Sequence, residues 1–127
     1  MHTAAICAGL LGLLVFGLGA AVSGVRGATN TVIGYNPDPA DRLYKMVRAH
    51  GNAAEYNPMF AVLILYLGAH APATWIVWVF VIATAARISH AAGMILSPTL
   101  AKPQPLRFAG ALGSVACGII LSVAAMM

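Results

Sequence analysis

AAICAGLLGLLVFGLGAAVSGV, residues 4–25, is a long apolar run without a charged side chain. Apolar runs of about 18 or more residues indicate membrane-spanning helices, because about 20 helical residues cross a hydrocarbon core roughly 30 Å thick. Further apolar runs extend from near Asp41 to about Leu67, from Ala73 to about Leu96, and from Pro105 to the C-terminus. The sequence therefore predicts an all-α integral membrane four-helix bundle that forms a single domain, residues 1–127.

The composition excludes most soluble classes of protein. The 127 residues are 61% hydrophobic and only 8% charged, well below the charge content of a soluble domain. The net charge of +4 does not indicate nucleic-acid binding, because the basic residues lie at or near helix ends rather than along a solvated stripe. Cys7 and Cys117 lie inside apolar runs without metal-ligand spacing, and we expect them to be small core residues.

The distribution of lysine and arginine predicts the orientation. The first and third connections hold or border basic residues, whereas the N-terminus and the second connection hold none; these basic residues are Arg26, Arg42, Lys45, Lys102 and Arg107. By the positive-inside rule, the first and third connections face the cytoplasm and both termini face outward. Asp41 is the expected N-cap of the second helix, and Pro105 is expected to begin the fourth.

Charged side chains inside the second and third spans mark the candidate site, because buried charges in a membrane usually face a partner or a cavity. Arg48, Asn52 and Glu55 share one face of the second helix, and Arg87 and His90 share one face of the third. In an antiparallel hairpin these two faces come to similar depths, with Glu55 within reach of Arg87. One carboxylate then faces two guanidinium groups, and the excess positive charge favours an anion.

Two alternatives stay open at this point. A buried pair of Glu55 and Arg87 can set the register of two helices without binding any ligand. The surplus charge of Arg48 favours the ligand site. Small residues also recur at four-residue spacing along the fourth span, and such a stripe serves either packing within the bundle or an interface between protomers; they are Gly110, Ser114, Gly118 and Ser122. A single histidine on the patch gives no reason to expect a metal.

The run RAHGNAAEYNP, residues 48–58, resembles a signature of the family of membrane-associated proteins in eicosanoid and glutathione metabolism (MAPEG). The motif positions that match are Arg48, Asn52, Glu55, Tyr56 and Pro58. In the third span, ARISHAAG resembles a second family motif through Arg87, His90 and Gly93. The number and spacing of the spans are similar as well, most closely to a small bacterial branch.

The resemblance implies a homotrimer in the bacterial inner membrane with glutathione, a co-substrate, bound between protomers. It implies a role in holding glutathione for Arg48, Asn52, Glu55, Tyr56, Arg87 and His90. It makes Arg107, at the start of the fourth span, the candidate that polarises the thiol. Many eicosanoid-forming relatives carry a tyrosine where this chain has Met94, which argues against leukotriene or prostaglandin chemistry.

The leading functional hypothesis is a glutathione transferase or peroxidase that acts on lipophilic electrophiles arriving from membrane lipid. The alternative is a non-catalytic lipid-binding or scaffold protein of the same fold. A small multidrug transporter is a third class with short four-helix chains. Such transporters need a carboxylate in the first span, and this chain has none there.

Overall fold

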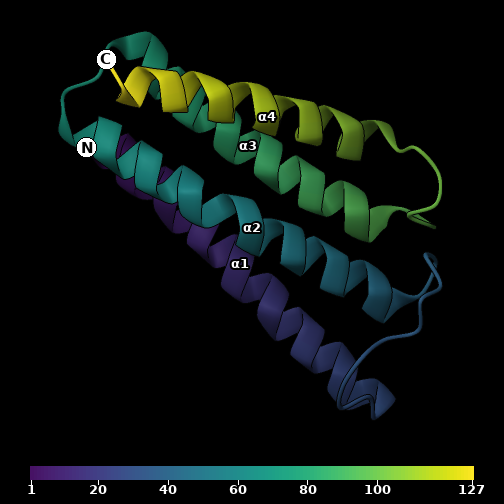
Figure 1. Ribbon diagram of the computed structural model, residues 1–127. Coiled ribbons are helices and arrows are strands. Elements are labelled where there is room, and N and C mark those ends of the chain that lie inside the picture. Colours follow the sequence, from purple (N-terminus) through teal and green to yellow (C-terminus); the bar gives the residue numbers. More distant parts are fainter.

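The computed structural model describes all 127 residues as four long helices joined by short connections (Figure 1). The helices are α1, His2–Thr29; α2, Arg42–Ala69; α3, Thr74–Leu96; and α4, Pro105–Ala125. Each helix runs back alongside the one before it, so both termini lie at the same end as the α2–α3 connection (Figure 1). The two connections that hold or border the basic residues lie at the opposite end. The predicted all-α four-helix fold is confirmed.

The predicted helix ends are close to the observed ones. Asp41 caps α2 through its carboxylate, which accepts a hydrogen bond from the Tyr44 backbone N–H at 2.9 Å. Pro105 begins α4 directly after the capping residue Gln104. Helix α1 extends beyond the predicted apolar run and ends at Thr29; the C-cap residue Asn30 follows, and its left-handed backbone (φ 51°) closes the last turn.

Three helices, α1, α3 and α4, are long and apolar enough to cross a membrane by length and composition. Helix α2 has the same length as α1 but carries Arg48 and Glu55 inside it, which is why composition alone does not select it. Because α2 runs antiparallel beside α1 over most of its length, it shares the depth of its neighbour (Figure 1). Helix α2 therefore belongs to the same membrane bundle.

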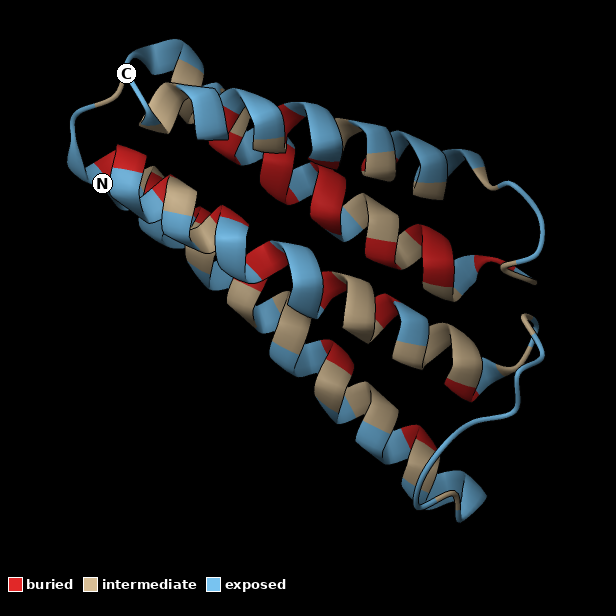
Figure 2. Ribbon diagram, in the orientation of Figure 1, coloured by how far each residue is buried: buried red, intermediate tan, exposed pale blue.

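The buried residues lie mainly on the helix faces turned inward, and the outer faces remain apolar (Figure 2). One core cluster, near the end that carries the termini, contains both Cys7 and Cys117, as expected for small core residues. Exposed apolar side chains include Phe16 at 79% and Trp78 at 64%. Exposed apolar faces of this kind suit contact with lipid or with other protomers.

Helices α3 and α4 pack with their backbones in contact. A Cβ added to Gly110 would lie 2.5 Å from the His90 backbone nitrogen, and one added to Gly93 would lie 2.5 Å from the Arg107 backbone nitrogen. Only glycine permits so close an approach. The small-residue stripe therefore serves packing within the bundle at Gly110 and Ser114, whereas Gly118 faces the Phe60 ring of α2.

Candidate functional site

The guanidinium of Arg87 lies at the centre of the bundle, with the residue 1% exposed. Its Nε donates a hydrogen bond to Asn57 Oδ1 at 3.0 Å. One terminal nitrogen donates to Ser114 Oγ at 3.3 Å, and the other to the backbone oxygen and Oδ1 of Asn52 at 3.2 and 2.6 Å. Arg87 thus joins α2, α3 and α4 through a single planar group.

Every hydrogen-bond acceptor around Arg87 is neutral: two side-chain amide oxygens, one hydroxyl and one backbone carbonyl. The expected ion pair between Glu55 and Arg87 is not formed, and Glu55 lies exposed on α2. The reason is that Asn52 and Asn57 occupy the edge of the guanidinium that faces α2. Hydrogen bonds to a charged group each stabilise by roughly 1.5–3 kcal/mol, which offsets part of the cost of burying Arg87.

Tyr56 covers the face of this guanidinium. The ring centroid lies 4.8 Å from Arg87 Cζ, a distance at which a cation is attracted to the ring. The tyrosine remains 39% exposed, so its ring separates the buried charge from the outer surface. The structure therefore brings three predicted site residues, Asn52, Tyr56 and Arg87, into one cluster.

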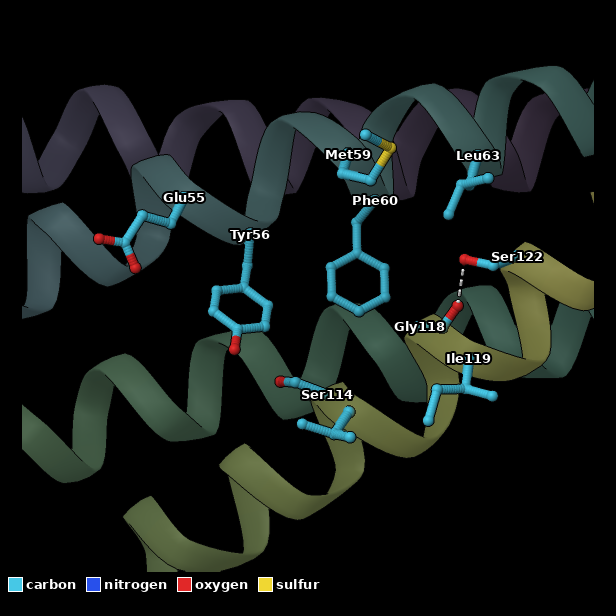
Figure 3. Close-up of a pocket in the computed structure, with 10 residues that line it drawn as sticks. Glu55, Tyr56, Met59, Phe60, Leu63, Ser114, Gly118, Ile119 and Ser122 are labelled. Carbon is cyan, nitrogen blue, oxygen red and sulfur yellow. Dashed lines mark hydrogen bonds between the residues drawn. The ribbon is translucent and has the colours of Figure 1, made fainter.

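A groove of about 610 Å³ begins at this cluster and runs between α2 and α4 (Figure 3). Glu55, Tyr56 and Ser114 supply polar groups, and the Glu55 carboxylate points away from the apolar residues. The rest of the lining is mostly apolar or small: Met59, Phe60, Leu63, Val115, Gly118, Ile119 and Ser122. A volume of this size is typical of small-molecule sites. The groove combines a polar end with an apolar wall, which suits an amphiphilic ligand.

His90 and Arg107 form a second group at the α3–α4 seam. His90 Nδ1 is hydrogen-bonded to the Arg107 backbone oxygen at 2.9 Å, which fixes the imidazole against α4. The Arg107 guanidinium donates to the backbone oxygens of Leu100 and Lys102 at 3.2 and 3.0 Å. The guanidinium holds the α3–α4 connection and is not directed at the Arg87 cluster.

Arg48 lies exposed on the same α2 face as Asn52 and Glu55. His50, expected to face away from the patch, packs against α1, with its Nε2 3.2 Å from the position that a Cβ on Gly19 would take. Met94 is buried in an apolar cluster with Leu18 and Ala53. The Met94 side chain therefore contributes no polar group to the site.

Sequence reasoning missed Asn57 and undervalued Ser114. Asn57 is 2% exposed and bridges two helices, because its Nδ2 donates to the Leu11 backbone oxygen at 3.1 Å while its Oδ1 accepts from Arg87. Ser114 donates to the Gly110 backbone oxygen and accepts from Arg87. The available signal was a polar amide on the inward face of a membrane helix, where each polar group needs a partner.

Comparison with known proteins agrees with this architecture. None of the curated proteins matches the chain. The family model described as the MAPEG family matches residues 4–127, essentially the whole chain. The protein therefore belongs to the MAPEG family of membrane proteins.

Proposed function

We propose that this protein is a membrane-bound glutathione transferase or peroxidase that activates the glutathione thiolate for attack on lipophilic electrophiles. The observation that carries the proposal is the Arg87 guanidinium, which is buried among neutral acceptors at the polar end of an apolar groove. The positive charge of Arg87 has no carboxylate partner, so it favours an anionic ligand in the groove on the outer side of Tyr56 and Ser114.

Glutathione fits the charges on this face of α2. Its carboxylates can accept charge-assisted hydrogen bonds from arginine, and Arg48 is exposed and available for that role. Its ammonium group can donate to the exposed carboxylate of Glu55. Asn52 and Tyr56 complete the polar face, and Arg87 of α3 contacts both; His90 is proposed to support the site from the α3–α4 seam, where it binds the Arg107 backbone.

Arg107 is the proposed catalytic residue. A guanidinium beside the sulfur favours the thiolate, which is the nucleophile, so no protein nucleophile is required. Arg107 binds the carbonyls of Leu100 and Lys102 in this structure, which leaves three of its five N–H donors for a thiol. The apolar groove offers the lipophilic electrophile a path from the bilayer to the polar end.

The same proposal includes a homotrimer in a bacterial inner membrane, with both termini in the periplasm. The exposed apolar faces and the basic residues at the end opposite the termini support it. Chemical cross-linking in mild detergent is expected to give a three-fold species, and a clean monomer or dimer across several detergents contradicts the trimer. A reporter active only in the cytoplasm, fused after Met127, is expected to stay silent.

One observation favours a second candidate, a non-catalytic lipid-binding or scaffold protein. The Arg107 guanidinium donates to two backbone carbonyls of the α3–α4 connection and so has a structural role. The two candidates differ in the state of the bound thiol, because only an enzyme of the proposed kind needs a stabilised thiolate.

Equilibrium binding of glutathione to the detergent-purified protein tests the proposal. Arg48→Ala is expected to weaken binding by roughly 1.5–3 kcal/mol, the range for a hydrogen bond to a charged group. Ultraviolet titration of the bound thiol is expected to show a pKa depressed by about 1–3 units by a nearby cation. Arg107→Ala should abolish that depression while leaving affinity largely intact. If glutathione binds but the pKa of its thiol is not below that of free glutathione, the transferase is excluded and the second candidate remains.

A further inference from the structure

Asn57 is the only side chain that connects α1 to the buried guanidinium. Its Nδ2 donates to the Leu11 backbone oxygen of α1, and its Oδ1 accepts from Arg87 Nε of α3. The opposite orientation of the amide would place an N–H against the Nε–H and an oxygen against the Leu11 carbonyl. Both contacts would be repulsive, so the two neighbours hold the amide in one orientation.

The hydrogen bond between Asn57 and Arg87 Nε determines where the terminal nitrogens of the guanidinium lie. A guanidinium is planar and its donors form a rigid fork, so fixing Nε directs the terminal nitrogens. One terminal nitrogen donates to both the backbone oxygen and the Oδ1 of Asn52. Only the Nδ2 of Asn52 is then left to donate to a ligand. The orientation of Asn57 is thus passed through Arg87 to Asn52, a half-buried residue of α2.

The chemical type of residue 57 also decides the charge of the cluster. An aspartate would have nearly the same shape and would still accept from Arg87 Nε, but it would cancel the guanidinium charge. The amide of Asn57 satisfies the same hydrogen bond and leaves the positive charge in place. Opposite charges within hydrogen-bonding distance interact far more strongly in a low dielectric than they do in water.

We propose that Asn57 is a positioning residue of the glutathione site, one that orients Arg87 and through it Asn52 while leaving the positive charge of the guanidinium uncompensated, so that this charge attracts an anionic ligand through space. This inference rests on the proposed function. It assigns Asn57 two separable effects, orientation of the site and preservation of its charge. Asn57→Leu removes both hydrogen bonds and adds no charge, whereas Asn57→Asp keeps the bond to Arg87, loses the bond to Leu11 and adds a negative charge.

Two ligands separate these effects in an equilibrium binding experiment. Glutathione carries free carboxylates, and glutathione diethyl ester has the same peptide skeleton with both carboxylates neutralised. Asn57→Asp is expected to lower the affinity for glutathione by about tenfold or more and to leave the affinity for the diester close to that of the wild type. Asn57→Leu is expected to lower the affinity for both ligands by a similar factor. Asn36→Asp in the α1–α2 connection is the matched control, since it makes the same change in net charge away from Arg87.

The outcomes are distinct. Equal weakening of both ligands by Asn57→Asp means that residue 57 acts only on packing, and unchanged binding means that it does not act on the site; either result overturns the proposal. If Asn57→Asp does not fold, Asn57→Leu decides, because unchanged glutathione affinity in that variant also overturns it. A wild-type protein that does not bind glutathione overturns the proposed function and this inference together. Wild-type binding with unaltered ligand selectivity in Asn57→Asp overturns this inference alone.

Discussion

Helix α4 meets its two neighbours in opposite ways. Toward α3 its backbone is in contact, because Gly110 and the facing Gly93 have no side chains to keep the helices apart. Toward α2 it leaves a groove of about 610 Å³, and a Cβ added to Gly118 would make only ordinary contact with the Phe60 ring at 3.5 Å. The comparison shows that the same residue type, eight positions apart on one helix, closes one face and leaves room at the other.

The turn from one face to the other follows from helix geometry. Residues four apart on an α-helix are separated by about 400°, so each step drifts about 40° around the axis. The buried seam of α4 therefore follows Gly110 and Ser114 and then shifts to Cys117 and Leu121. Gly118 and Ser122 rotate out of that seam into the groove. Ser114 lies where the two faces meet, which is why it contacts Arg87 and also lines the groove.

The largest expected effect comes from a substitution in the close backbone contact between α3 and α4. Gly110→Val would place side-chain carbons against the His90 backbone, which cannot yield as a flexible side chain would. We expect a loss of stability of about 3 kcal/mol, at the upper end of overpacking costs. Thermal unfolding of the detergent-purified protein measures it. Gly118→Val is the matched control and should be nearly neutral; equal losses in the two variants would falsify the contrast between the faces.

The next effect concerns the polar cluster between the two faces. Arg87→Met keeps an unbranched apolar stem but removes the guanidinium, which leaves the Asn57 amide oxygen buried without a donor. We expect destabilisation of about 1–3 kcal/mol, the cost of an unsatisfied buried polar group, together with loss of glutathione binding. Denaturation and binding are measured on the same preparation. Arg87→Lys, which keeps the charge without the fork, should recover only part of either property; full recovery would mean that the planar geometry is unimportant.

A smaller effect is expected from a substitution that fills the groove between α2 and α4. Ile119→Trp adds bulk to the apolar wall of the groove and lies outside the buried seam. If the groove admits the lipophilic substrate, KM for that substrate should rise by roughly tenfold, in the range for altered hydrophobic pockets, while glutathione affinity stays constant. Steady-state kinetics with both substrates varied provides the measurement. Loss of the oligomer on size-exclusion chromatography would show instead that another protomer occupies the groove.

The smallest effect concerns the contact between α2 and the α3–α4 connection. Lys45 Nζ donates to the Ser97 backbone oxygen at 2.8 Å, and the Leu100 N–H donates to the Pro39 oxygen at 2.9 Å nearby. Lys45→Met should cost about 0.5–1.5 kcal/mol, less than a fully buried hydrogen bond to a charged group, because the Lys45 ammonium is only part-buried. Hydrogen exchange is expected to rise across residues 97–101 and to stay unchanged in the α2–α3 connection. A uniform increase along the chain would contradict a local role for this contact.

The amino-acid sequence by itself determined the helices of this protein. Four apolar or amphipathic runs of membrane-spanning length, separated by segments rich in turn residues, can form only helices in a bilayer, because each backbone polar group must be satisfied within its own segment. The motif residues of α2 and the pair Arg87 and His90 were also visible as polar groups at helical spacing. These properties depend on neighbours within one or two turns, which the sequence displays directly.

Only the tertiary structure decided what those polar groups bind. The sequence predicted that Glu55 would pair with Arg87, but the guanidinium is bound by Asn52, Asn57 and Ser114 instead. Depth along two helices can be estimated from a rise of about 1.5 Å per residue, but the rotation of each helix about its own axis cannot. That rotation is set by packing across the bundle, including the backbone contact at Gly93 and Gly110. It turns Glu55 outward and Asn57 inward, because residues two apart on a helix lie about 200° from each other around its axis, so the rotation that buries one exposes the other.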